Sequence, residues 1–203
     1  GWYALTIARW VPDALVHAFE PIPKTFTYLL ANIELNQLPN VHAHNFGFSN
    51  AAGELTFYYY PEGSVNASAA NLSGRADALQ IPCQVHTLDA WLAQSGLTAD
   101  FVKCDVEGAE LFVFQGGAGM LTRQRPAIFT EMMRKWSAQF GYHPNQIIAL
   151  LGAAGYACFR IADGWLTEFD NMNESTVETN FVFLHRERHL ADIIALTNRE
   201  GLP

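Results

Sequence analysis

Acidic side chains gather in one short stretch, where their types and spacing could do chemistry. Asp105 and Glu107 follow the apolar run 101–104, and the chain then passes through Gly108 into an amphipathic stretch. This order predicts a buried strand that leads into a helix, with the acids at the junction. Ligands of open α/β sheets bind at the carboxyl ends of the strands. Two carboxylates there could act as a general base, attract a cationic ligand or hold a divalent metal ion.

Two further acids end predicted strands. Glu20 follows the apolar run 14–19, and Glu131 ends the run 127–131. In a parallel sheet the carboxyl ends of the strands lie on one edge, so we expect Glu20, Asp105 and Glu131 to line the same crevice. Glu20 also lies nineteen residues after Gly1. That distance is close to the ~20 residues that separate a glycine-rich turn from the acid that binds a ribose.

Helix capping offers a simpler role for some of these acids, because a carboxylate near a helix N-terminus stabilises the helix by ~0.3–1 kcal/mol. Glu110 falls within the predicted helix, and we expect it to be structural. For Asp105 and Glu107 capping alone seldom explains such a pair, and we favour a function. Glu131 lies at the end of a predicted strand, and for it a structural and a functional role are evenly balanced.

The elements that must position these acids alternate along the chain. Strands are predicted at 14–19, 41–48, 54–60, 81–86, 101–105, 127–131, 156–161 and 180–184, and helices at 1–8, from 23 onward, at 87–92, after 108, at 144–151 and at 188–198. Alternating strands and helices favour an α/β fold with a parallel sheet, here in a single domain over 1–203. The polar segment 61–80 is predicted to be a loop, either a lid, a binding loop or a disordered segment.

The start of the chain is unusual for such a domain. Residues 1–8 already have an amphipathic helical pattern, and no strand precedes them. A parallel α/β domain should not begin on its first helix, so we expect this domain to be N-terminally incomplete.

Composition excludes several classes of function. The 203 residues include 12 basic and 20 acidic ones, with a net charge of −8. Because the basic residues are also scattered, we expect no nucleic-acid partner. No run reaches the ~20 apolar residues that span a bilayer, so we expect a cytoplasmic protein without a membrane segment. Cys83, Cys104 and Cys158 stand apart in apolar runs, which favours buried free thiols over disulfides or a zinc site.

One series of residues resembles a known family. The segments His17-Ala-Phe-Glu-Pro21, Asn32-Ile33, 102–111 and 126–131 occur in this order. Together they resemble the FkbM-type methyltransferases, a branch of the class I enzymes that use S-adenosylmethionine. The most specific element is the run 103–110, lysine-x-aspartate-x-glutamate-glycine-x-glutamate. The resemblance covers essentially the whole chain and implies a Rossmann-like, mostly parallel sheet with helices on both faces.

The resemblance also implies which residues bind the cofactor. They are Gly1, Tyr3, Glu20, Pro21, Asn45, Phe46 and Asp105. Glu20 would hold the ribose, and Asp105 would lie beside the methionine moiety and the methyl acceptor. The first strand of the family and most of its first glycine motif are absent, and only the end of that motif is matched, by the residues from Gly1 onward.

The implied reaction is O-methylation of a hydroxyl on a sugar or a hydroxylated natural product, so the expected partner is a small molecule or a saccharide. A hydroxyl is a poor nucleophile and gains from a base. The candidate bases are Asp105, Glu107 and Glu131, with His44 and His143 in reserve. A divalent cation held by two of the acids could activate the same oxygen. The sequence does not decide between a base and a metal.

Two other functions fit parts of the pattern. An oxidoreductase of Rossmann type also has an acid after its second strand, although the acidic junction 105–110 fits it poorly. A non-catalytic, methyltransferase-like binding domain is suggested only by the incomplete first motif. Binding of a reduced nicotinamide cofactor, without binding of S-adenosylhomocysteine, would favour the oxidoreductase.

Overall fold

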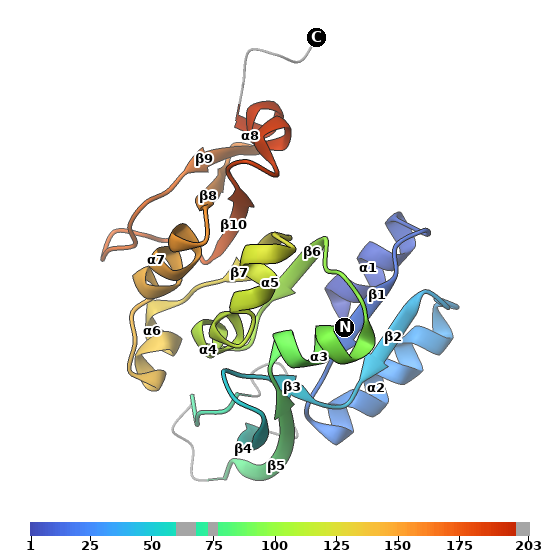
Figure 1. The fold of residues 1–203 in the computed structure, drawn as a ribbon. Coiled ribbons are helices and arrows are strands. Elements are labelled where there is room, and N and C mark those ends of the chain that lie inside the picture. The colour runs from blue at the N-terminus through green and yellow to red at the C-terminus, as the bar shows by residue number, and fades with distance from the viewer. Residues whose placement is uncertain (60–67, 73–76, 198–203) are drawn as a thin grey trace. The chain divides into compact units, whose positions relative to one another are not determined.

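The computed structural model describes residues 1–59, 68–72 and 77–197 (Figure 1). The chain divides into two compact units, Gly1–His86 and Thr87–Pro203. Helices and strands alternate in both, so the α/β class expected from the sequence is confirmed. The sheets combine parallel and antiparallel pairs, which differs from the mostly parallel sheet that the resemblance implies. The single domain over 1–203 stays a prediction.

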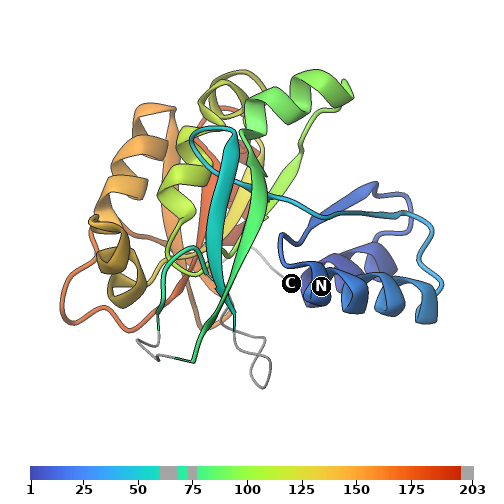
Figure 2. The same cartoon turned by 90° about the horizontal axis from the view of Figure 1, so that it is seen from below.

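The first unit begins with two helices and a parallel pair of strands. In chain order these are α1 (Trp2–Trp10), β1 (Val16–Phe19), α2 (Pro23–Leu35) and β2 (Val41–His44). Both helices pack on one face of the strand pair, as Figure 2 shows, because Ala18 and Val41 meet Ala8 and Leu29 there in one buried cluster. Pro23 opens α2 as predicted, since its fixed φ suits the first turn of a helix.

The opposite face of β1 and β2 carries aromatic and imidazole rings. Side chains alternate between faces along a strand, so His17 and Phe19 share a face with His42 and His44. The Nδ1 atom of His17 and the Nε2 atom of His44 are 2.9 Å apart. The ring of His44 also stacks on Phe19, with 4.8 Å between the centroids. His44 is therefore engaged in packing within this unit.

The predicted strand 41–48 forms two strands. β2 ends at His44, and β3 (Gly47–Phe48) joins a second sheet in the order β3-β5-β4. Its other members are β4 (Gly53–Tyr59) and β5 (Leu79–His86). β5 pairs in parallel with β3 and antiparallel with β4.

The loop predicted over 61–80 lies largely outside the described residues. Within the part that is described, Ser68 pairs with Tyr58 across an isolated antiparallel bridge, and β5 begins at Leu79 rather than at residue 81. Within the described residues, Ser68 therefore adds a bridge to β4, and Leu79 and Gln80 belong to β5 of the same sheet.

The second unit is built on a five-stranded sheet in the order β6-β7-β10-β8-β9. Its strands are β6 (Phe101–Cys104), β7 (Ala127–Glu131), β8 (Tyr156–Ala162), β9 (Trp165–Glu168) and β10 (Asn180–His185). Its helices are α3 (Leu88–Ser95), α4 (Glu110–Gln115), α5 (Ala118–Arg123), α6 (Arg134–Ser137), the 3₁₀ helix η2 (Ala138–Phe140), α7 (Asn145–Ala153) and α8 (Leu190–Thr197). β6 and β7 are parallel, and the other neighbouring pairs are antiparallel.

β9 is a strand that is not predicted from the sequence. It forms a hairpin with β8, in which Ala162 pairs with Trp165. The two residues between them, Asp163 and Gly164, have φ of 52° and 82°. Asp-Gly is the residue pair that tight hairpin turns with two positive φ angles prefer. The turn residues were thus the signal in the sequence, although the strand they introduce is short and half-buried.

Two expectations about composition can be compared with the structure. Cys83, Cys104 and Cys158 are buried free thiols, as expected. Over residues 1–59, 68–72 and 77–197, no helix combines the length and the apolarity that crossing a membrane requires.

Two buried histidines join the end of β10 to the start of α8. His185 is 4% exposed and His189 is 8% exposed. The Nδ1 atom of His185 accepts the N–H groups of Glu187 and Arg188, at 3.2 and 3.3 Å. The Nδ1 atom of His189 accepts the N–H group of His185, at 3.0 Å. A ring nitrogen that accepts is unprotonated, so this arrangement requires both rings to be neutral.

We expect these histidines to weaken the fold in acid. Burial, followed by the charge of Arg125, lowers the pKa of His185, and burial lowers that of His189. A histidine with a lowered pKa contributes stability that is fully present above pH 6.5, its pKa in the unfolded chain. This stability is lost as the pH falls from there toward the lower pKa of the folded protein. His189→Asn keeps an acceptor at the position of Nδ1 but does not titrate. Urea unfolding at pH 7.5 and 5.5 should therefore give a smaller acid loss for this variant than for the wild type.

The exposed His143 provides a matched control. Its Nδ1 atom also accepts a backbone N–H group, that of Asn145 at 3.2 Å. His143→Asn should leave the acid loss as it is in the wild type. An equal reduction in both variants would contradict the assignment to the buried pair.

Candidate active site

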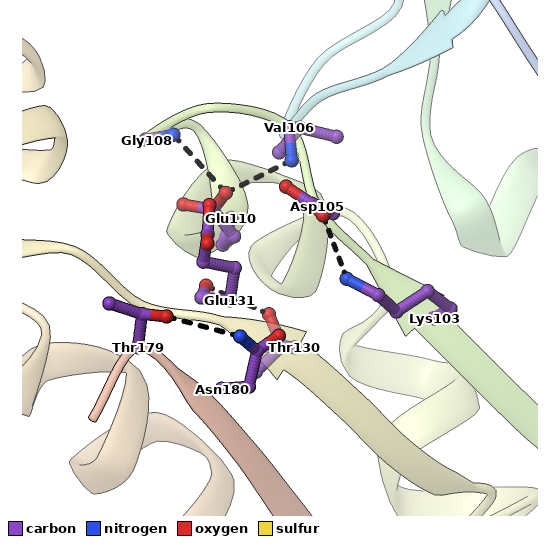
Figure 3. A network of polar contacts seen from close by, with 9 residues as sticks. All are labelled: Lys103, Asp105, Val106, Gly108, Glu110, Thr130, Glu131, Thr179 and Asn180. Carbon is purple, nitrogen blue, oxygen red and sulfur yellow. Dashed lines mark hydrogen bonds and ion pairs between the residues drawn. The ribbon is translucent and has the colours of Figure 1, made fainter. Parts of the chain in front are cut away.

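The carboxyl ends of β6 and β7 bring Asp105 and Glu131 together. The strands are parallel neighbours in which Cys104 pairs with Thr130. The residues that follow this pair, Asp105 and Glu131, therefore lie beside each other (Figure 3). Thr130 is fully buried, and it fixes the end of β7 in the interior of the sheet. The two acids therefore share one edge of the sheet, as the sequence predicts.

Glu107 completes a group of three acids, which we call the carboxylate cluster. One carboxylate oxygen from each of Asp105, Glu107 and Glu131 lies within 4.8 Å of the other two. Asp105 is exposed, and the two glutamates are half-buried. The cluster is therefore accessible from solvent on one side, and it offers the oxygen atoms that a proton or a cation would bind.

Lys103 is a basic neighbour of the carboxylate cluster that was not among the predicted site residues. Its Nζ atom lies 2.9 Å from Oδ2 of Asp105, and the Lys103 side chain is only 12% exposed. The same Nζ atom lies 5.1 Å from the centroid of the Phe129 ring. Residues two apart in a strand share a face, so the spacing of Lys103 and Asp105 was a usable signal. The ion pair orients Asp105, while three carboxylates against one ammonium leave an excess of negative charge.

Burial, together with this excess of negative charge, makes Glu107 hold its proton more tightly than a glutamate in water does. Burial, and then the charges of Asp105, Glu131 and Glu110, raises the pKa of Glu107 to about 7. Burial and Asp105 also raise the pKa of Glu131, and a hydrogen bond to Asp105 adds to this effect. Near neutral pH Glu107 can therefore both accept and release a proton, which is the property required of a general base or acid.

The backbone of the turn after β6 is unusual at two consecutive residues. Glu107 has a φ of 54°, and Gly108 has a φ of 99°. Only glycine adopts such angles without cost. A Cβ atom at Gly108 would also lie 2.8 Å from the carbonyl carbon and oxygen of Trp136 in α6. Position 108 therefore requires glycine both for its backbone conformation and for the close approach of Trp136. The turn also fixes the direction of the Glu107 side chain.

Glu110 has the structural role expected of it, through a contact that the sequence does not reveal. Its side chain is buried, and Oε1 accepts the N–H groups of Val106 and Gly108, at 3.0 and 3.1 Å (Figure 3). Burial raises the pKa of Glu110 despite these hydrogen bonds. The carboxylate thus holds the turn that precedes α4.

In the first unit, three of the predicted cofactor residues meet where β1 and β2 end. Oε1 of Glu20 accepts the N–H group of Ile22, at 2.9 Å. The side-chain amide of Asn45 donates to the carbonyl oxygens of Glu20 and Pro21, at 2.8 and 3.1 Å. Burial raises the pKa of Glu20. Glu20 belongs to this unit, and its place in one crevice with Asp105 and Glu131 stays a prediction.

The other residues of the first unit that are predicted to bind the cofactor are Phe46, Gly1 and Tyr3. The ring of Phe46 packs against Phe19 and against His86, with centroids 5.4 and 4.6 Å apart. Gly1 precedes α1 and Tyr3 lies in its first turn, and both are exposed. Their contact with a cofactor stays a prediction.

Comparisons with known proteins identify similar methyltransferases. Residues 3–158 match the family described as the methyltransferase FkbM domain. The chain is 26% identical over 134 residues to "Methyltransferase 1" of Beauveria bassiana (strain ARSEF 2860), covering 57% of this chain and 54% of that protein. It is 31% identical over 145 residues to "Methyltransferase sdnD" of Sordaria araneosa, covering 57% and 56%. The chain thus spans about half the length of these curated relatives.

A solved structure has a similar fold. It is the methyltransferase FkbM from Methylobacillus flagellatus KT, with a TM-score of 0.54 over 90% of this chain and 40% of that chain. At 13% sequence identity this similarity concerns the fold alone. The family match, by contrast, spans well over half of the 203 residues and includes β6, β7 and all three acids of the carboxylate cluster. The chain belongs to the FkbM methyltransferase domain family.

Proposed function

We propose that this protein uses S-adenosylmethionine to methylate a hydroxyl group of a sugar or a hydroxylated natural product. Family membership supports methyl transfer, and the finer assignment rests on the carboxylate cluster. The observation that carries it is the pKa of Glu107, raised to about 7 within 4.8 Å of two other carboxylates. The proposal includes the Rossmann-like arrangement typical of class I methyltransferases.

The residues after β1 and β2 fit the ribose of this cofactor. Glu20 uses Oε1 for the N–H group of Ile22, and a carboxylate can accept hydrogen bonds from both hydroxyls of a ribose. The two bonds from Asn45 to the carbonyl oxygens of Glu20 and Pro21 hold the backbone of this turn in place. When bound, S-adenosylmethionine supplies an electrophilic methyl group on a positively charged sulfur.

The carboxylate cluster would act on the acceptor. The carboxylate of Glu107 accepts the proton of the acceptor hydroxyl, which increases the nucleophilicity of the oxygen. Lys103 keeps Asp105 oriented, and the negative charge of Asp105 and Glu131 favours proton uptake by Glu107. A divalent cation on the same carboxylates is the alternative activator. Loss of activity in a chelator, restored by Mg²⁺, would favour the cation over the base.

Calorimetric titration of S-adenosylhomocysteine tests the cofactor assignment. With the protein in its natural sequence context, we expect binding that Glu20→Ala weakens at least about tenfold, because a hydrogen bond to a charged group is worth about 1.5–3 kcal/mol. Glu34→Ala, an exposed residue of α2, is the control and should bind as the wild type does. Absence of binding by the wild type would remove the cofactor and the proposed reaction with it.

A further inference from the structure

Two buried side chains, those of Glu110 and Tyr142, hold the turn that carries Glu107. Tyr142 has so far been given no role in the proposed reaction. Glu110 is 1% exposed and Tyr142 is 7% exposed. Tyr142 follows the 3₁₀ helix η2 and lies more than thirty residues after the turn in sequence. No feature of the sequence around Gly141-Tyr142 indicates this contact.

The two side chains fix Gly108 from both directions. The N–H group of Gly108 donates to Oε1 of Glu110, at 3.1 Å. The hydroxyl group of Tyr142 donates to the carbonyl oxygen of Gly108, at 2.8 Å, and accepts the N–H group of Leu111, at 3.4 Å. Its oxygen also lies 3.4 Å from Oε2 of Glu110. Both backbone polar groups of Gly108, the residue after Glu107, are therefore held by buried side chains.

This restraint matters because the backbone of Glu107 is in an unfavourable conformation. A non-glycine residue with a positive φ is strained, and it keeps this conformation only where its surroundings enforce it. Without the restraint on Gly108, Glu107 can return to a negative φ, and its side chain then moves away from Asp105 and Glu131. The carboxylate cluster thus depends on contacts made one residue farther along the chain.

We propose that Tyr142 is a positioning residue for methyl transfer, whose hydroxyl group holds the Gly108 carbonyl and thereby keeps Glu107 against Asp105 and Glu131. The inference rests on the proposed role of Glu107 as a base. Glu110 contributes through the N–H groups of Val106 and Gly108, and Tyr142 completes the restraint from the carbonyl side.

A nuclear magnetic resonance titration of the glutamate carboxyl carbons tests this positioning directly. The signal of Glu107 is assigned by its disappearance in Glu107→Gln. In Tyr142→Phe we expect the pKa of Glu107 to fall from about 7 by more than one unit, toward the ordinary value of 4.5. The fall follows because the side chain leaves the other carboxylates and enters solvent. An unchanged titration of Glu107 in folded Tyr142→Phe would overturn the proposal.

Tyr156→Phe is the matched control in the same unit. Tyr156 is also a buried tyrosine, at 4% exposed, and within the described part of the chain its hydroxyl oxygen has no hydrogen-bond partner. This variant should leave the titration of Glu107 unchanged. An equal fall in both variants would assign the effect to general loosening of the unit and would overturn a specific role for Tyr142.

A second pair of variants keeps the proposal testable if Tyr142→Phe does not fold. Glu110→Gln and Glu110→Ala remove the same charge, but only glutamine retains an oxygen that can accept the N–H groups of Val106 and Gly108. The pKa of Glu107 should be higher in Glu110→Gln than in Glu110→Ala. Equal values would show that holding the turn does not matter.

Turnover separates this inference from the proposed function. With a hydroxylated acceptor, Tyr142→Phe should lower kcat and move the acid limb of the pH profile downward, with KM for S-adenosylmethionine unchanged. If S-adenosylhomocysteine does not bind the wild type, the proposed function fails while the carboxyl titration still decides the positioning. If binding is intact and the titration is unchanged, the positioning alone fails.

Discussion

Glu107→Gln is expected to lower methyl transfer by about 10²–10⁴-fold, the usual contribution of a positioned base. Glutamine has nearly the same shape but cannot accept the proton of a hydroxyl group. Because the pKa of Glu107 is raised to about 7, the wild-type rate should fall as the pH drops below 7 and the base becomes protonated. The residual rate of the variant should lack this acid limb. Formation of S-adenosylhomocysteine with a panel of sugars and hydroxylated natural products measures both effects.

The control for this variant is Glu168→Gln. Glu168 ends β9 and forms an exposed ion pair with Arg186, so it has the same chemical type in the same unit. It should retain full activity. Wild-type activity in Glu107→Gln, with its pH profile intact, would exclude Glu107 as the base and would leave Asp105, Glu131 or a bound cation as the activator.

Gly108→Ala is expected to destabilise the second unit by about 3 kcal/mol or more. A φ of 99° is unfavourable for alanine by about 1–2 kcal/mol. The added Cβ atom would also lie 2.8 Å from the backbone of Trp136 and 2.9 Å from its Cβ, where no flexible side-chain end can move aside. Enforced strain of this kind belongs to the small group of changes with large effects on stability. Urea unfolding followed by circular dichroism measures the loss.

Gly164→Ala separates the two causes. Gly164 has a φ of 82°, and a Cβ atom there would meet no heavy atom within 4 Å. It should therefore lose only the conformational part, about 1–2 kcal/mol. Equal losses in the two variants would show that α6 yields to the new methyl group and that the close approach of Trp136 is not a constraint.

Local patterns in the sequence were sufficient for most elements and for the core of the candidate site. The apolar runs ending at Asp105 and Glu131 predicted two strands, and pairing of β6 with β7 in parallel then brings their ends together. Glu107 could be included because it lies two residues after Asp105. These predictions depend only on the alternation of residue types and on the rule that parallel strands end on one edge.

Other features could not be predicted because they depend on contacts between distant residues. The bond from Tyr142 to Gly108 joins residues 34 apart, and no local pattern specifies it. The predicted strand 41–48 is divided at Asn45, whose side chain bonds to the carbonyl groups of Glu20 and Pro21, 25 and 24 residues earlier in the sequence. The mixture of parallel and antiparallel pairs could not be predicted for the same reason, because the composition of an apolar run does not indicate in which direction the strand runs relative to its neighbour.

The order β6-β7-β10-β8-β9 also has a consequence for synthesis of the protein. β10 follows β6, β7, β8 and β9 in the sequence and leaves the ribosome after them, yet it occupies the space between β7 and β8. Until Asn180–His185 has emerged, both neighbours present open edges that can pair with other chains. The sheet cannot close before β10 has emerged, so during that interval the open edges of β7 and β8 expose the nascent second unit to aggregation.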